Sequence, residues 1–152
     1  MKRFARSSSG VTLLEIMLVL AVAANILVMS IRFYQTATAN QQANAALQMI
    51  EGITAAADSL KQATGSYSQG GVSTDTIQQL MPNQSMTSPW NTDVIVVGAT
   101  DSKFAIAFQG MPKAVCASIA NRVLADSRYV PDRNNRCAQS GVFAVWFCPL
   151  GC

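Results

Sequence analysis

The sequence predicts an α+β fold, in which a long N-terminal α-helix, half membrane-spanning and half packed, lies against an antiparallel β-sheet head with a disulfide-bound C-terminal region. Three observations predict it. Residues 11–31 are almost entirely apolar, residues 32–64 continue with apolar residues at helical spacing and no proline, and residues 65–152 carry short strand-like runs and all four cysteines. The 152 residues, 50% of them apolar, suffice for one domain and one membrane-length segment.

The net charge of +3 comes from the first ten residues, where Lys2, Arg3 and Arg6 stand without an acidic residue. In the rest of the chain the basic and acidic residues are equal in number. A neutral body gives no support for specific nucleic-acid binding. The chain contains no histidine, which removes the commonest general base and a frequent metal ligand. We therefore expect neither an enzyme nor a cofactor or metal site.

Residues 11–31 are long enough to cross a bilayer, because a helix of this length rises about 30 Å. The basic residues ahead of this segment favour an N-terminus held in the cytoplasm and export of the rest. One interpretation is a plain membrane anchor, and a second is a secretory signal cleaved at the small-x-small sequence "AVA" at 21–23. A third takes account of Glu15, an acidic residue inside the apolar run, five positions after Gly10.

The order of a basic leader (residues 1–10), Gly10, Val11 and Glu15 before a long apolar helix resembles the class III signal of type IV prepilins. The resemblance implies that a prepilin peptidase cleaves after Gly10 and N-methylates Val11, and that the apolar segment stays in the mature protein. A carboxylate in an apolar medium needs a partner, and the new Val11 amine of a neighbouring subunit would supply one. Glu15 would then serve assembly. The alternative is a Glu15 that snorkels to the lipid headgroups.

Residues 11–31 are expected to form the transmembrane or filament-core part of the first helix, and residues 32–64 its amphipathic continuation. An apolar stripe with spacings of three and four residues marks the face that should pack on a globular part. Its members are Leu47, Ile50, Ile53, Ala57 and Leu60. Gly65 is the expected stop signal, so the whole helix would be about 80 Å long.

Residues 65–152 are expected to form the globular head. A short helix is predicted at 74–80, and strands are predicted at 93–98, 103–109 and 141–148. Residues 98–101 would be the loop of an antiparallel hairpin. The run at 141–148 is apolar on both faces, which is typical of a buried central strand, and Trp146 within it is expected to lie in the core.

A second helix is predicted to start at Pro112 and to run to about residue 127, with Cys116 on its inward face. Residues 129–137, "YVPDRNNRC", read as a polar loop.

The four cysteines, Cys116, Cys137, Cys148 and Cys152, are even in number and follow an export-like N-terminus, which indicates two disulfides. Their spacing lacks the closely paired ligands of a zinc ribbon. Three pairings are possible. We favour one bridge from Cys116 to the C-terminal pair, with Cys137 bonded to the other member.

The resemblance to type IV pilins extends more loosely over the whole chain. It implies a structural subunit that polymerises into a helical homo-oligomer, a pilus or fimbrium, for adhesion, aggregation, motility or conjugative contact. A cysteine-bearing helix between two strands, the "SPWNTD" turn and the non-Phe residue at 11 are more similar to the type IVb branch, although leaders there are usually longer.

The implied partners are the prepilin peptidase, the inner-membrane pilus assembly machinery, an outer-membrane secretin and a host or bacterial surface receptor. The implied localisation is the bacterial inner membrane as a precursor and then the extracellular pilus. Two alternatives remain: a pseudopilin of a type II secretion system, and a membrane-anchored binding protein that never polymerises.

Overall fold

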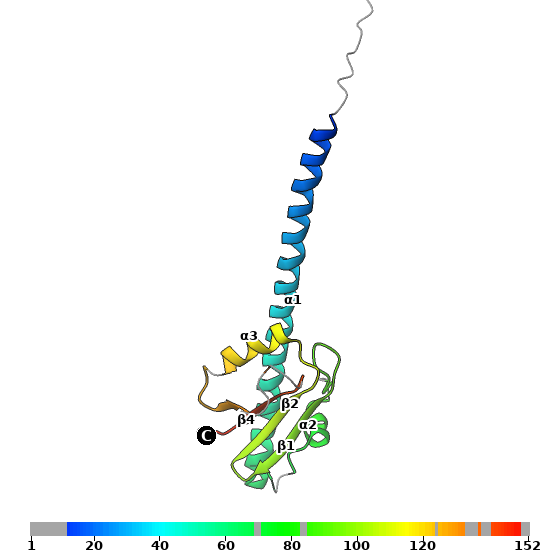
Figure 1. The fold of residues 1–152 in the computed structure, drawn as a ribbon. Coiled ribbons are helices and arrows are strands. Elements are labelled where there is room, and N and C mark those ends of the chain that lie inside the picture. Colours follow the sequence, from blue (N-terminus) through cyan, green and yellow to red (C-terminus); the bar gives the residue numbers. More distant parts are fainter. Residues whose placement is uncertain are drawn as a thin grey trace, which may run out of the picture. The chain divides into compact units, whose positions relative to one another are not determined.

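The computed structural model describes residues 12–68, 71–82, 85–123, 125–132, 137 and 141–149. The chain divides into two compact units, Met1–Ala37 and Thr38–Cys152. One helix, α1 (Leu13–Thr64), supplies the described backbone of the first unit and continues into the second. The predicted combination of a long apolar N-terminal helix with an antiparallel sheet is confirmed (Figure 1).

Both ends of α1 follow from local chemistry. At its start, the carbonyl of Thr12 accepts hydrogen bonds from the N–H groups of Glu15 and Ile16. At its end, Gly65 has a φ of 84° and donates its N–H to the Lys61 carbonyl at 2.6 Å. A residue in this left-handed conformation terminates a helix, and glycine adopts it without a steric penalty. The predicted stop at Gly65 is therefore confirmed.

The second unit contains a four-stranded antiparallel sheet in the order β1-β2-β4-β3. The strands are β1 (Val94–Thr100), β2 (Lys103–Phe108), β3 (Tyr129–Pro131) and β4 (Phe143–Phe147). The expected central position of the 141–148 run is confirmed, because β4 pairs with β2 on one side and with β3 on the other. The short helix α2 (Thr74–Leu80) has the predicted bounds, and Ser73 caps its N-terminus.

Three details of the head differ from the sequence prediction. The hairpin loop is shorter than residues 98–101, because β1 continues to Thr100 through a register shift after Gly98 and only Asp101 and Ser102 form the turn. Helix α3 (Lys113–Val123) ends before residue 127. After α3, the N–H groups of Ala125 and Asp126 bond to carbonyls three residues earlier and form turns. The chain then enters β3, which lies inside the segment predicted to be a loop.

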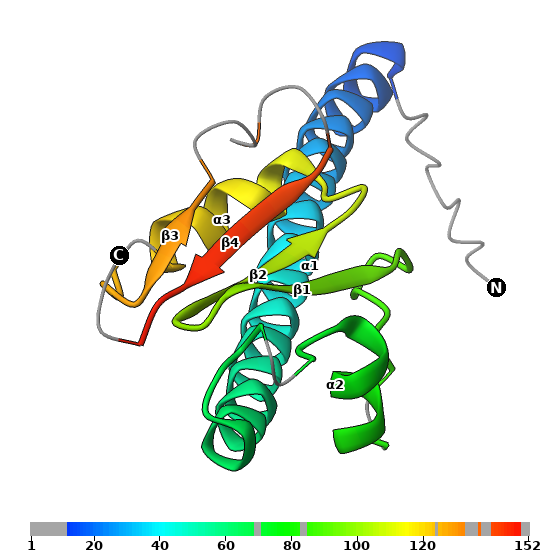
Figure 2. The same ribbon diagram turned by 90° about the horizontal axis from the view of Figure 1, so that it is seen from below.

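The core lies between one face of the sheet and the two helices α1 and α3, which cover that face (Figure 2). Alternate residues of each strand point into it, so that Val96, Ile106 and Val145 form one buried row across the sheet. From α1 the core receives Ala43, Ala46, Ile50, Ile53 and Ala57. The predicted stripe is thus confirmed at its centre, while Leu47 and Leu60 at its ends are partly buried.

Trp146 was predicted to lie in the core, and this prediction is wrong. It sits between two inward-facing β4 residues in sequence and is therefore on the opposite face of the sheet, where it is only partly buried. The ammonium group of Lys103 lies 5.3 Å from its ring centroid. The run 141–148 is apolar on both faces, but only one of those faces is covered by helices.

Both edges of the sheet are protected against a further strand. On β1, the outward N–H groups of Val94, Val96 and Gly98 donate to the Met86 carbonyl, the Thr74 hydroxyl and the Val72 carbonyl. On β3, the N–H of Tyr129 donates to the Asp126 carbonyl, and Pro131 has no N–H to offer. Such edges do not template sheet-to-sheet association of heads.

Candidate functional site

Of the predicted processing and assembly residues, Gly10 and Val11 lie outside the described residues, and Glu15 lies in the first turn of α1. The side chain of Glu15 is exposed. Its backbone N–H bonds to the Thr12 carbonyl at 3.0 Å, so the carboxylate sits close to the first, unpaired N–H groups of the helix. The positive end of the helix dipole favours a negative charge at this position.

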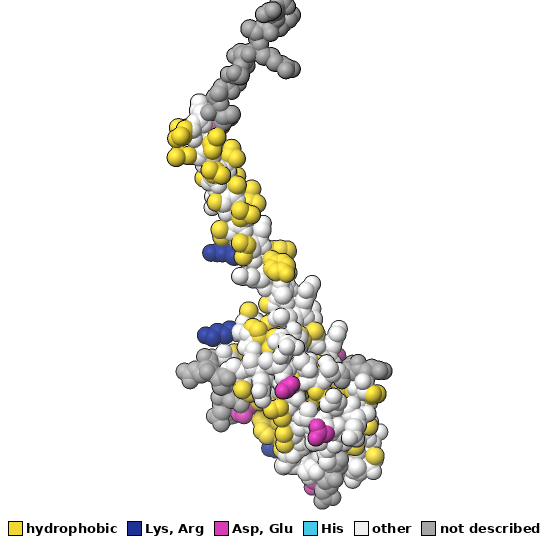
Figure 3. All heavy atoms as spheres, turned by 90° about the vertical axis from the view of Figure 1, so that its right-hand side faces the viewer, with side chains coloured by type: hydrophobic (Ala, Val, Ile, Leu, Met, Phe, Trp, Pro, Cys, Tyr) yellow, Lys and Arg dark blue, Asp and Glu magenta, His cyan; other side chains and the backbone are white. Residues whose placement is uncertain are grey.

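The first part of α1 presents an apolar surface on the face that Figure 3 shows. Every large hydrophobic side chain from Leu13 to Tyr34 is between 51% and 77% exposed. Within the described residues, α1 is the one helix long and apolar enough to cross a membrane, with a mean hydropathy of 2.4 over its most apolar window of 18 residues. Exposed apolar surface of this extent calls for a bilayer or other protein chains around it.

Three polar side chains in this stretch or just after it donate to backbone carbonyls of the helix itself. Asn25 donates to the Ala21 carbonyl at 3.1 Å, Ser30 to the Ile26 carbonyl at 2.8 Å, and Thr36 to the Arg32 carbonyl at 3.0 Å. Because these donors need no water, the three side chains add little to the free energy required to place the helix in an apolar medium. Glu15 and Arg32 are the charged residues of this stretch.

The disulfide that the structure describes joins Cys116 to Cys137, with 5.7 Å between their Cα atoms. The favoured pairing of Cys116 with the C-terminal pair is therefore wrong. Cys116 is buried on α3, as predicted, but its partner lies in the segment between β3 and β4 and not on the sheet. Cys148, just after β4, is disulfide-bonded as well, and Cys152 lies outside the described residues.

A buried tyrosine that the sequence analysis did not single out connects the C-terminal end of α1 to the sheet. Tyr67 has no exposed surface, and its ring lies 5.0 Å from that of Phe104. Its hydroxyl donates to the Asp58 carboxylate at 2.5 Å, and the ammonium group of Lys61 lies 4.4 Å from its ring centroid. Burial, followed by the bond to Asp58 and the negative charge of that group, raises the pKa of Tyr67 well above its ordinary value.

Asp101, at the tip of the β1–β2 hairpin, holds the loop that follows α1. Its carboxylate accepts hydrogen bonds from the hydroxyls of Ser66 at 2.5 Å and Ser68 at 2.6 Å. These bonds, with that from Ser66 the larger cause, lower the pKa of Asp101.

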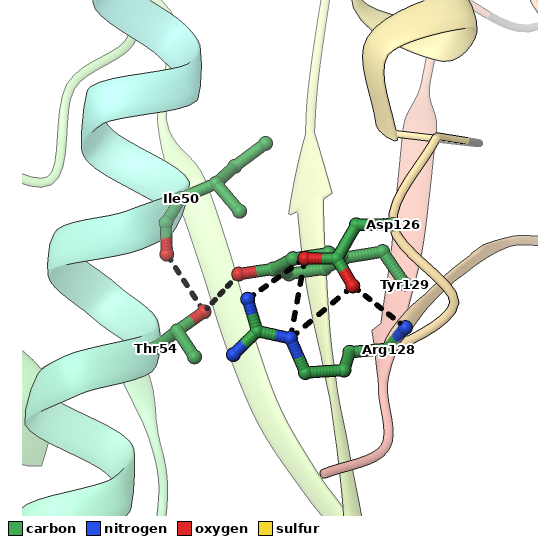
Figure 4. A network of polar contacts seen from close by, with 5 residues as sticks. All are labelled: Ile50, Thr54, Asp126, Arg128 and Tyr129. Atoms are coloured by element: carbon green, nitrogen blue, oxygen red, sulfur yellow. Dashed lines mark hydrogen bonds and ion pairs between the residues drawn. The ribbon is translucent and has the colours of Figure 1, made fainter. Parts of the chain in front are cut away.

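A second polar network joins the middle of the packed part of α1 to the start of β3 (Figure 4). The Thr54 hydroxyl bonds to the Ile50 carbonyl at 2.8 Å and lies 3.2 Å from the hydroxyl of Tyr129. Beside this contact, the guanidinium of Arg128 donates to the Asp126 carboxylate, with 2.7 Å between Nη2 of Arg128 and Oδ2 of Asp126. This side-chain bonding lowers the pKa of Asp126. The pair is exposed and contributes little to stability, but it shapes the turn between α3 and β3.

Next to this network lies a cleft of about 180 Å³, which we call the Glu51 cleft. It is lined by Leu47, Ile50, Glu51, Arg122, Val123, Asp126 and Tyr129. Its walls come from three segments that are distant in sequence: α1, the end of α3 and the start of β3. Helical spacing predicted that Leu47 and Ile50 share a face, but no sequence signal pointed to their lining a cleft.

The described part of the chain contains no cluster of three or more His, Cys, Asp or Glu side chains that could hold a metal ion. The two features suited to interaction are the exposed apolar stretch of α1 with its acidic first turn, and the partly charged Glu51 cleft. The chain matches no protein-family model, no curated protein and no solved structure.

Proposed function

We propose that this chain is a type IV pilin, a structural subunit that polymerises through its apolar N-terminal helix into a surface filament. The observation that carries the proposal is the combination, on α1, of an exposed apolar stretch of membrane length with a single acidic residue in its first turn. A simple anchor gains nothing from that acid, because a carboxylate in the apolar segment raises the free energy of insertion.

Cleavage after Gly10 would give Glu15 a partner. The new amine of Val11 would be a cation four residues before Glu15 in the sequence, and the amine of one subunit would pair with Glu15 of the next. The pair sets the register of the helices, because a subunit that slips along the bundle leaves both charges unpaired in an apolar layer. Assembly buries the hydrophobic side chains of the stretch, and this burial drives the process.

The head is suited to the surface of such a filament. Its sheet edges are occupied or lack donors, so the heads need not polymerise through their strands. At least one disulfide, Cys116–Cys137, closes the region after β2, which is consistent with an exported protein. These features support the pilin proposal over a head that itself drives aggregation.

The test is the intact mass and N-terminal peptide of the protein isolated from bacterial membranes and from sheared surface material. We expect a chain that lacks its first ten residues and begins at N-methylated Val11, recovered in long fibres. An intact Met1 would contradict the proposal and favour a membrane-anchored binding protein, and an N-terminus at Ala24 would indicate an ordinary secretory signal. Processed protein that stays in the membrane and forms no surface fibres would favour a pseudopilin.

A further inference from the structure

The Glu51 cleft combines an apolar floor with a charged rim. Leu47, Ile50 and Val123 give the floor its aliphatic surface, and the Tyr129 ring adds an aromatic wall. The hydroxyl of Tyr129 is turned toward Thr54, so its ring is held in place. A cleft of about 180 Å³ accommodates one long side chain rather than a cofactor.

Two of the three charges on the rim already have partners. The Asp126 carboxylate is bonded by the guanidinium and the backbone N–H of Arg128. Arg122 donates to the side-chain oxygen of Asn44. Glu51 is exposed, and within the described residues it makes no hydrogen bond and no ion pair. Glu51 is thus the one carboxylate of the cleft that no described residue binds, and the positive charge of Arg122, whose partner Asn44 is neutral, lies on the same rim. An unbound carboxylate beside an apolar floor suits a cation with a long aliphatic stem.

The chain itself carries a cation of this kind. Among the basic side chains that the structure describes, Lys61 and Lys103 stack on aromatic rings, and Arg122 and Arg128 are hydrogen-bonded. The two left without such a contact are Arg32 and Lys113. Arg32 lies near the end of the exposed apolar stretch of α1, between Ile31 and Phe33, so bundling of that stretch brings its guanidinium against protein, where it needs an acid.

We infer that Arg32 of one copy docks in the Glu51 cleft of a neighbouring copy, where its guanidinium binds the Glu51 carboxylate. The inference rests on the proposed function, since it requires copies that pack through α1. Both residues belong to the same helix and are many turns apart along it, so the pairing is between chains. The planar guanidinium can donate two hydrogen bonds to the carboxylate while its stem covers Leu47 and the face of the Tyr129 ring.

The first experiment reverses the charges in the full chain and compares sheared filaments with processed subunit in the membrane. Arg32→Glu and Glu51→Arg should each reduce the filament yield more than tenfold, because each brings two like charges together. The double variant should restore the yield to within about threefold of wild type. Lys113→Glu is the matched control, since it reverses the other unpartnered cation, and its yield should not change. Single variants that assemble normally, or a double variant no better than the singles, would overturn the inference.

The second experiment measures proximity and does not depend on yield. Filaments assembled from chains that carry both Arg32→Cys and Glu51→Cys, so that neither charge is left without its partner, are treated with a short thiol-specific cross-linker. A ladder of covalently linked multimers is expected, and Lys113→Cys with Glu51→Cys should give none. Filaments without a ladder would refute the Arg32–Glu51 contact and leave the pilin proposal standing. Wild-type cells that make no filaments at all would refute the pilin proposal itself.

Discussion

Tyr67 is the residue whose replacement tests the packing of the head most directly. The variant Tyr67→Phe keeps the ring, and with it the contacts at 5.0 Å to Phe104 and 6.5 Å to Phe147. It removes only the hydroxyl that donates to the Asp58 carboxylate at 2.5 Å. A hydrogen bond to a charged group contributes about 1.5–3 kcal/mol. Because Asp58 is half-buried and water replaces part of the bond, we expect a loss near the lower end, about 1.5 kcal/mol.

The same residue predicts a loss of stability at alkaline pH. Burial and Asp58 raise the pKa of Tyr67 in the folded protein, whereas an unfolded tyrosine titrates near its ordinary pKa of about 10. The stabilisation is therefore fully present below pH 10 and is lost as the pH rises further. One proton retained by the folded state but lost by the unfolded state lowers the free energy of unfolding by about 1.4 kcal/mol per pH unit.

The assay is urea unfolding of the full-length protein in detergent at pH 7 and from pH 9 to 12, followed by the fluorescence of Trp90 and Trp146 in the head. The quantity to compare is the difference between wild type and Tyr67→Phe, which cancels the titration of the other groups. This difference should shrink above pH 10. Tyr129→Phe is the control, because the Tyr129 hydroxyl is hydrogen-bonded to the neutral hydroxyl of Thr54, and this variant should keep the alkaline loss of the wild type. A stability difference that is independent of pH would refute the reasoning.

Three further predictions concern assembly, cross-linking and backbone packing. The Glu15→Ala protein should insert into the membrane and be processed normally, but its ratio of filaments to membrane-bound processed subunit should fall, since an unpaired buried amine costs about 3–5 kcal/mol. A normal filament yield from the variant alone would favour the alternative in which Glu15 contacts the lipid headgroups. Replacing both Cys116 and Cys137 by alanine should lower the free energy of unfolding by about 3 kcal/mol, the loop-closure value for a loop of this length, and a urea midpoint equal to that of wild type would contradict it. Gly98→Ala should cost about 1–3 kcal/mol, because a Cβ there would lie 2.6 Å from the Tyr67 carbonyl oxygen, and thermal unfolding that is unchanged from wild type would show that the backbone yields.

Features that depend on neighbouring residues along the chain were predictable from the sequence. The absence of proline, the apolar spacing of three and four, and Gly65 together determine where α1 runs and where it ends, because helical hydrogen bonds and capping act over a few residues. The bounds of α2 and the central place of β4 follow from similarly local signals. The Gly10, Val11 and Glu15 signature is also wholly sequential, and the pilin interpretation of it stays a prediction.

Features that depend on contacts between distant segments were decided only by the tertiary structure. Strand β3 has three residues, one of them a proline, so it exists because β4 offers it a partner and not because of its own propensity. The pairing of Cys116 with Cys137 was one of three possibilities and not the favoured one, and only the fold, which places α3 beside the segment after β3, selects it. The Tyr67–Asp58 bond and the Glu51 cleft arise in the same way. Tertiary packing determines which side chains meet across the core, and the sequence alone does not show this packing.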